Sequence, residues 1–191
     1  MKQPMFTEEI KYAVETAAKS QWPKLTNISL SSTIKWISSP KWLLDQIGGS
    51  PLVRALNALT YVFSPEPELS GLGIMYSLMG IEALYAQGQE DSIGEQILYK
   101  TQAIFGSREG LRKKIKGMYD FRSRLVHGQL DFVPCFTDWY PSELRKTYKK
   151  LYDANDIAIA ILLATFQKMI INDWKTLTFE YALREADSKN F

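Results

Sequence analysis

One short stretch of this chain combines side chains that could act on a phosphate. The segment GMYDFRSRLVHGQ, residues 117–129, contains Arg122 and, five positions later, His127, the only histidine among 191 residues. A guanidinium can neutralise a phosphate group, and an imidazole can transfer a proton near neutral pH. Brought together at one site, the two side chains would support cleavage of a phosphodiester.

Arg122 falls on the apolar side of its predicted helix, in line with Ile115, Met118 and Val126. A guanidinium that is partly buried needs an anionic or dipolar partner, because an unpaired charge there costs several kcal/mol. Glu82 is the best candidate, since it also occupies the apolar side of its own predicted helix. The sequence therefore predicts an Arg122–Glu82 ion pair between two core helices, and this tie could be the whole role of Glu82.

His127 is predicted to stand at the end of that helix. In a continuous helix it would lie roughly 140° around the axis from Arg122, so the two side chains would not share a face. Gly128 indicates that the helix stops here, with the glycine in the left-handed C′ position. The negative end of the helix dipole would then favour the protonated imidazole. The alternative is a histidine that only caps the helix, and from the residues alone this role is the more common one.

The segment YDFRSRLVHG resembles the signature of the HEPN superfamily, an arginine followed after four to six residues by a histidine. Arg122, Ser123 and His127 match it with a four-residue gap. The segment is most similar to the Apea-like branch, which has a tyrosine, then RS, two residues and VHG. GIEALYA at residues 80–86 and the helix Leu98–Gly106 resemble that branch's upstream helices. The resemblance covers roughly residues 52–172.

The resemblance implies an all-α bundle that dimerises and, in many members, a metal-independent endoribonuclease of phage-defence, toxin–antitoxin or stress-response systems. On this reading Arg122 binds the scissile phosphate and His127 acts as general acid or base while the ribose 2′-OH attacks. Ser123 would hold the phosphate or orient the histidine. Glu82, Tyr119 and Gly128 would support the site. No metal or other cofactor is expected.

Two alternatives to a ribonuclease remain open. Other HEPN members bind nucleic acid without cutting it, so the chain could be a non-catalytic RNA-binding or dimeric assembly module. It could also be a helical interaction protein with an accidental motif, in which case Arg122 would form an ion pair within one subunit. The partners expected are RNA, a second copy of the chain, and an antitoxin or another protein.

Basic residues cluster just before the motif in REGLRKKIKG, residues 108–117. Such a cluster can attract RNA phosphates, although it is also typical of an ordinary solvated helix face. The residues predicted to bind substrate are Arg112, Lys113, Lys116 and Arg124.

The composition indicates a soluble, cytoplasmic protein with no membrane contact. Hydrophobic residues make up 46% of the chain, the net charge is +2, and the most apolar run, IAIAILLATF, is too short to span a bilayer. The single cysteine, Cys135, cannot form an internal disulfide and is expected to be a buried, unreactive thiol. Trp36 and Trp42 are expected to pack irregular segments onto the core.

The hydrophobic periodicity predicts a HEPN-like helical bundle of four to five helices with an irregular N-terminal extension. Residues 1–50 would form the extension, 51–172 the helical domain and 173–191 a final helix or tail. Residues 24–50 are predicted as a short strand, a hairpin or a packed loop. Met75, Tyr76 and Met79 are predicted on the main apolar face of their helix. The predicted helices cover residues 7–21, 52–63, 70–87, 92–105, 107–126 and 142–172.

Overall fold

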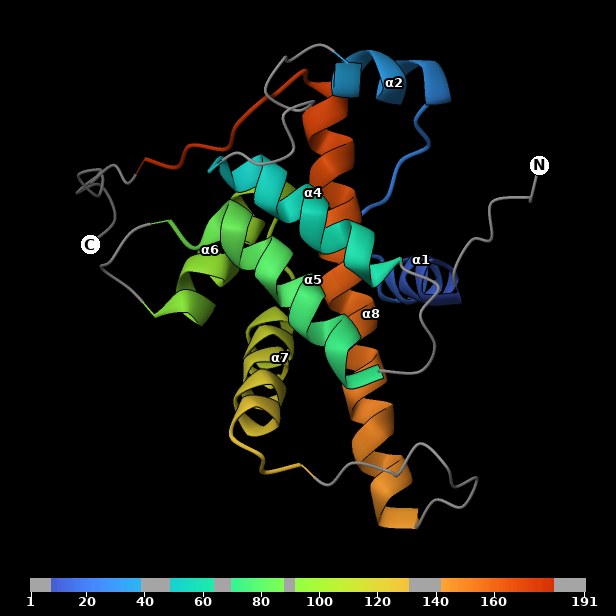
Figure 1. Ribbon diagram of the computed structural model, residues 1–191, viewed down its shortest axis with the longest axis vertical. Helices are drawn as coiled ribbons and strands as arrows, with labels where there is room; N and C mark the ends of the chain where they lie inside the picture. The colour runs from blue at the N-terminus through green and yellow to red at the C-terminus, as the bar shows by residue number, and fades with distance from the viewer. Residues whose placement is uncertain (1–7, 39–48, 64–69, 88–91, 131–141, 181–191) are drawn as a thin grey trace, which may run out of the picture.

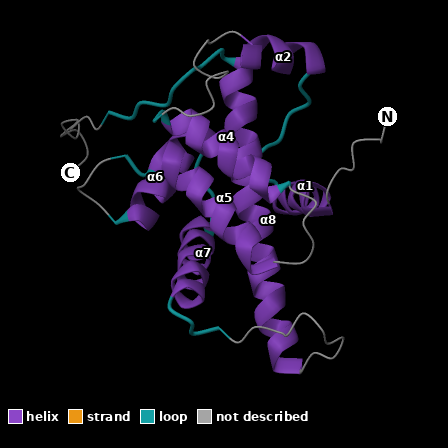
Figure 2. Cartoon of the chain, viewed as in Figure 1, coloured by secondary structure: helices purple, strands orange, loops and turns teal. Residues whose placement is uncertain are grey.

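The computed structural model describes residues 8–38, 49–63, 70–87, 92–130 and 142–180 (Figure 1). Every regular element within these ranges is a helix, which confirms the all-α prediction (Figure 2). The helices are α1 (Glu8–Ser20), α2 (Leu30–Ser38), α4 (Pro51–Val62), α5 (Ser70–Tyr85), α6 (Ile93–Phe105), α7 (Leu111–Val126) and α8 (Ser142–Ile171).

Helix α8 forms the centre of the fold. In Figure 1 it runs along the long axis, with α4 and α5 crossing it, α7 beside its first half and α2 across its final turns. The stretch Arg145–Ile171 is long and apolar enough to cross a bilayer by length and composition, but 67% of its most apolar window is buried against the rest of the protein. That burial identifies α8 as the core helix, which agrees with the interpretation of its apolar run.

Helix α5 is joined to α8 by hydrogen bonds between buried side chains. The Tyr85 hydroxyl lies 2.6 Å from Oγ1 of Thr165, and Thr165 in turn donates to the carbonyl oxygen of Ile161 at 2.7 Å. Because the Thr165 hydroxyl proton is used in the bond to Ile161, the Tyr85 hydroxyl donates the hydrogen bond to Thr165. About two turns earlier along α5, Ser77 Oγ lies 3.2 Å from Oδ1 of Asn155. Each bond satisfies polar groups that have no access to water.

A glycine allows α5 to approach α8 closely. A Cβ atom at Gly80 would lie 3.1 Å from both terminal methyl groups of Leu162 and 3.5 Å from the carbonyl oxygen of Ala55 in α4. The two contacts to Leu162 are shorter than an ordinary van der Waals contact, so a Cβ atom here would require the Leu162 side chain to shift by a few tenths of an ångström. The glycine therefore helps to set the spacing at the helix that carries Glu82.

A buried lysine joins α6 to the end of α5. The Lys100 side chain is 3% exposed, and its ammonium group donates to the carbonyl oxygens of Tyr85 at 2.6 Å and Gln87 at 2.9 Å and to Oε1 of Gln96 at 3.2 Å. A cation at this position is stabilised by the negative end of the helix dipole. Burial lowers the pKa of Lys100. The chain after α8 returns to this point, with the Phe179 ring 5.3 Å from the ammonium nitrogen.

Several helix ends lie where the sequence places them. Ser50 caps α4 by accepting a hydrogen bond from the backbone nitrogen of Val53 at 3.2 Å, and Pro51 stands in the first turn as predicted. Gly106 follows the last residue of α6 with φ of +82°, which confirms the predicted stop. Long-range packing then only has to orient helices whose ends are already defined locally.

The prediction of a strand, a hairpin or a loop for residues 24–50 was wrong in part, because Leu30–Ser38 is helix α2. Its many serine and threonine residues disguise the helical period, since they are common in loops and strands as well. Trp36 holds this helix in place. It is 4% exposed, and its indole nitrogen donates to the carbonyl oxygen of Trp174 at 3.1 Å, as expected for a tryptophan that packs its segment onto the core. Trp42 and Cys135 lie outside the described residues.

Two further predictions about helices need correction. The main buried face of α5 is formed by Ile74, Leu78 and Ile81, whereas Met79 is 53% exposed. This helix is apolar around most of its circumference, so periodicity alone does not select the buried side. Helix α7 begins at Leu111 and not at residue 107, because Gly110 before it has φ of +76°. Residues 174–180 of the predicted C-terminal helix or tail form no helix.

The tie between α5 and α8 can be tested by replacing Tyr85 with phenylalanine. Tyr85→Phe keeps the ring but removes the donor to Thr165, so the free energy of unfolding should fall by about 1 kcal/mol. Urea unfolding followed by circular dichroism measures this change. The matched control is Tyr152→Phe on the exposed side of α8, which should change the stability by less than about 0.3 kcal/mol. Equal effects of the two substitutions would contradict a structural role for the bond.

Candidate functional site

Helix α7 presents Arg122 towards α5. Leu111, Ile115 and Met118 bury one side of α7 in the core, and Arg122 follows one turn after Met118 on that side. Its Nε atom lies 3.4 Å from Oε1 of Glu82, with the two side chains 36% and 19% exposed. The predicted Arg122–Glu82 ion pair is therefore present, and it joins two core helices at the edge of solvent.

Tyr119 lies one turn before Arg122 and completes a small polar group around Glu82. The Tyr119 hydroxyl and Oε1 of Glu82 are both buried, and neither forms a hydrogen bond of good geometry with a described residue. Burial raises the pKa of the Tyr119 phenol, and the neighbouring Glu82 carboxylate raises it further, while Arg122 opposes the effect. The phenol is consequently neutral throughout the physiological range and can act as a hydrogen-bond donor but not as a base.

His127 is the C-cap residue of α7. The backbone nitrogen of Gly128 donates to the carbonyl oxygen of Leu125 at 3.2 Å, and that of Gln129 donates to the carbonyl oxygen of Arg124 at 2.8 Å. This pair of bonds is a Schellman motif, and Gly128 adopts the left-handed conformation that it requires, with φ of +64°. The predicted helix stop at Gly128 is confirmed. The imidazole itself is exposed to solvent.

Arg122 and His127 do not meet within one chain. They stand five positions apart, which places them about 140° apart around the helix, and no hydrogen bond joins the two side chains. Arg122 faces α5, whereas His127 continues the opposite, solvent-exposed side of α7. The exposed residues that share this outer face of α7 are Lys113, Lys116, Asp120, Ser123, Arg124 and His127. Ser123 thus lies with the histidine and not with the arginine.

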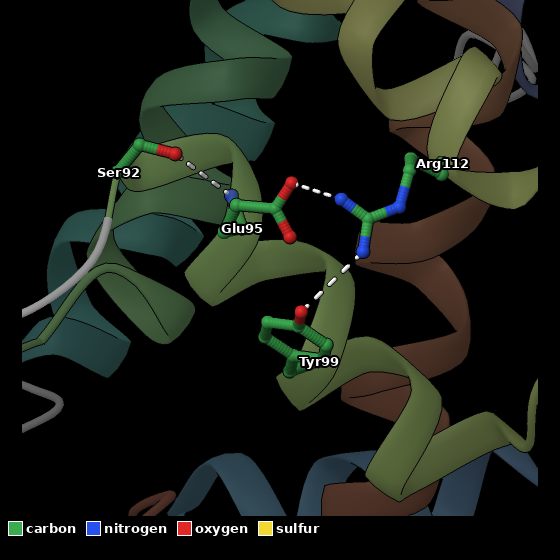
Figure 3. A network of polar contacts seen from close by, with 4 residues as sticks. All are labelled: Ser92, Glu95, Tyr99 and Arg112. Atoms are coloured by element: carbon green, nitrogen blue, oxygen red, sulfur yellow. Dashed lines mark hydrogen bonds and ion pairs between the residues drawn. The ribbon is translucent and has the colours of Figure 1, made fainter.

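Arg112, one of the residues predicted to bind substrate, is already engaged with α6 (Figure 3). Its guanidinium forms an ion pair with Glu95 and donates to the Tyr99 hydroxyl at 3.3 Å. Both contacts raise the pKa of Arg112. Glu95 is itself placed by the cap of α6, where its backbone nitrogen donates to Ser92 Oγ at 3.4 Å. Arg112 therefore helps to hold α7 on α6, and much of its charge is compensated.

The remaining predicted contact residues are free to meet an anion. Lys113 and Lys116 form no ion pair with any described residue, and Arg124 only approaches the carbonyl oxygen of Gln129 at 3.5 Å. Asp120 is the one acidic residue of α7, and it lies on the same outer face. The outer face of α7 is therefore a short cationic strip that ends at an exposed imidazole.

Sequence reasoning missed the Glu95–Tyr99–Arg112 network and the buried Lys100. The pattern SIGE at residues 92–95 has the spacing of a helix cap and could have placed Glu95 in a first turn, whereas no local pattern marks Lys100 as buried. Within the described ranges no group of three or more histidine, cysteine, aspartate or glutamate side chains is placed to hold a metal ion. No protein-family model, curated protein or solved structure matches this chain.

The polar group around Glu82 yields a stability prediction. Tyr119→Phe removes a buried hydroxyl that interacts with Glu82 but forms no hydrogen bond of good geometry with a described residue, so the free energy of unfolding should stay unchanged or rise by up to about 1 kcal/mol. Urea unfolding is again the measurement, and the loss expected for Tyr85→Phe provides the contrast. A loss of more than about 1 kcal/mol for Tyr119→Phe would show that the hydroxyl donates to Glu82 in solution. In that case the effects of Tyr119→Phe and Glu82→Gln would not add in the double variant.

Proposed function

We propose that this protein is a metal-independent endoribonuclease of HEPN type that acts as a homodimer, with Arg122 and His127 as its catalytic residues. The observation that carries the proposal is the arrangement of α7, where a cationic strip leads to an exposed imidazole only one and a half turns from a partly exposed arginine. The sequence resemblance to HEPN proteins supplies the chemistry that such an arrangement would perform.

Arg122 would bind and neutralise the scissile phosphate. Its contact with Glu82 is made through Nε, and a guanidinium has five N–H donors, so one contact does not exhaust it. Glu82 would hold the plane of the guanidinium and thereby position the remaining donors towards a phosphate. Such preorganised donors stabilise the negative charge that develops on the phosphoryl oxygens during attack.

His127 would transfer the protons of the reaction. An imidazole that accepts the proton of the ribose 2′-OH allows this oxygen to attack the adjacent phosphorus, while the bond from phosphorus to the 5′ oxygen breaks. The leaving oxygen takes up a proton, and the products are a 2′,3′-cyclic phosphate and a 5′-hydroxyl end. One imidazole serves as base and a second as acid. The chain has one histidine, so the second would come from another copy.

A homodimer would also resolve the separation of Arg122 and His127 around α7. Within one chain the two side chains face different directions, whereas pairing of two chains can bring the histidine of one beside the arginine of the other. We infer cytoplasmic RNA as the substrate, and an antitoxin-like or other protein as the partner that would restrain the activity.

The alternative is a non-catalytic RNA-binding or assembly module, and one observation favours it. Arg122 is paired with a carboxylate of its own chain, and this tie has a structural value without any chemistry. The same ion pair is what a helical interaction protein with an accidental motif requires. Cleavage of RNA therefore has to be measured directly.

The first test is an endonuclease assay on end-labelled single-stranded RNA in the presence of EDTA. The wild type should produce 2′,3′-cyclic phosphate ends, and His127→Ala or Arg122→Ala should each lower the rate by at least about 100-fold. Arg54→Ala, a change to an exposed arginine on α4, is the matched control and should keep full activity. Circular dichroism and sedimentation must show that each variant is folded and has the oligomeric state of the wild type.

Cleavage by His127→Ala at the wild-type rate would overturn the catalytic assignment. If neither the wild type nor any variant cleaves RNA, but RNA binding depends on α7, the non-catalytic module becomes the better description. An absence of both binding and cleavage would leave the helical interaction protein.

The cationic strip gives an independent prediction for RNA binding. Lys113→Ala and Lys116→Ala combined should reduce the slope of log K against log salt concentration by about 1.4, since each lost phosphate contact on single-stranded RNA contributes about 0.7. Arg112→Ala should change the slope by less than half as much, because Glu95 already compensates its charge. Fluorescence anisotropy at several salt concentrations measures the slopes. Lys35→Ala on α2 is the control, and an equal reduction by this variant would argue against a localised RNA site.

A further inference from the structure

Helix α1 rests on α8 through a contact whose buried α1 side chains are alanines and which contains a carboxylate. The only buried residues of α1 are Ala13 and Ala17, which pack on Ile159 and Ala160 of α8 and on Val62 of α4. Two methyl side chains remove little apolar surface from water, so the burial of α1 side chains stabilises this interface only modestly. The docking of α1 is consequently sensitive to any unfavourable charge in the interface.

Asp156 supplies such a charge. It is partly buried on α8 beneath α1, where it accepts a hydrogen bond from Thr16 Oγ1 at 3.3 Å. The charged groups that act on it are all carboxylates, namely Asp153 one turn earlier on α8 and Glu9 and Glu15 on α1. None of the described lysine or arginine side chains forms an ion pair with Asp156.

The lysine in the last turn of α1 does not relieve this repulsion. Lys19 pairs with Glu15 at 3.7 Å, and the Lys19 side chain is 79% exposed, so this pair lies on the solvent side of the helix. Burial, reinforced by the three carboxylates, raises the pKa of Asp156 from 3.8 to about 6, and only the Thr16 hydroxyl favours the ionised form. The carboxylate thus resists ionisation for as long as α1 covers it.

The connection after α1 anchors the end of this helix to the core. Gln21 has a left-handed backbone with φ of +51°, and the next residue, Trp22, is 6% exposed. The Trp22 indole donates to the carbonyl oxygen of Gly106 at 3.3 Å and packs edge-on against Phe105. The backbone nitrogen of Trp22 also donates to the carbonyl oxygen of Ala17 at 3.1 Å, so the end of α1 would stay attached to the core if the rest of the helix moved away.

We propose that α1 is a proton-controlled cover on α8, docked when Asp156 is protonated and released more readily when Asp156 is ionised. Release would uncover the apolar strip formed by Val62, Ile159 and Ala160. The direction follows from linkage. Docking takes up a proton between the ordinary pKa of an aspartate and the raised value, so the stabilisation is complete below about pH 4 and is lost as the pH rises through about 6.

The raised pKa of Asp156 sets an upper limit on how strongly pH can change the docking equilibrium of α1. A difference of about two pKa units corresponds to at most about 100-fold in the docking equilibrium. Because Asp156 is only partly buried, water screens part of this difference, and we expect about ten-fold.

Native-state hydrogen exchange on the full chain tests the proposal. After correction for intrinsic exchange rates, the protection of the α1 amides should fall about ten-fold between pH 4.5 and 7.5, while the α8 amides at Ile159–Leu162 stay protected. Asp156→Asn removes the titrating group and keeps an oxygen acceptor for Thr16, so its α1 amides should remain protected at pH 7.5. Asp120→Asn on the exposed side of α7 is the matched control and should behave like the wild type.

A second variant keeps the Asp156 carboxyl group and changes its pKa. Thr16→Val removes the hydrogen bond that favours the ionised carboxylate, so the midpoint of the pH dependence should move to a higher pH. Carboxyl carbon NMR of Asp156 follows the titration directly. The proposal is overturned if Asp156→Asn loses protection with pH as the wild type does, or if Asp156 titrates near 4 in the folded protein. These readouts do not depend on RNA or on Arg122.

Discussion

The positions of the helices depend on the need to satisfy polar groups that are buried against α8. Thr165 and Asn155 lie inside the core, and their partners Tyr85 and Ser77 both belong to α5, so α5 can cross α8 at only one register. Everything attached to α5 inherits this position. The carbonyl groups at its end hold Lys100 of α6, and Glu82 on its outer side holds α7. The candidate site is therefore placed by hydrogen bonds made on the same helix, within about one and a half turns of Glu82.

The two sides of helix α7 have different roles. The side that faces α5 contains apolar residues and the Arg122–Glu82 tie, whereas the outer side is cationic and ends at His127. An arginine that stabilises the fold and also binds substrate must be held firmly and still keep donors available, and a contact through Nε to a carboxylate at the edge of solvent meets both demands. The contact between α1 and α8 shows the opposite situation. Its carboxylate, Asp156, accepts a hydrogen bond from the Thr16 hydroxyl, and no cation among the described residues acts on it.

Much of this structure was accessible from the sequence, for identifiable reasons. Local signals placed Pro51, Gly106 and Gly128 correctly, since a proline, or a glycine after a helix, restricts the backbone without help from distant residues. The Arg122–Glu82 pair was also predictable, because charged residues on two apolar faces have few other partners. The buried side of α5 and the burial of Lys100 were not predictable, since both are decided by which helix packs against which. Helix α2 was missed because tertiary contacts of Trp36 stabilise a sequence with weak helical preference.

The single exposed imidazole at the end of α7 also makes the chain its own reporter. With one histidine in 191 residues, every imidazole resonance in a proton spectrum, and every product of an imidazole-selective reagent, arises from position 127. The residue is anchored by the backbone bonds of the Schellman motif, so its surroundings are defined even though its ring faces solvent. Nucleotides, a second subunit or a protein inhibitor that approaches α7 would all pass close to this one spectroscopic label, which the protein provides without any engineering.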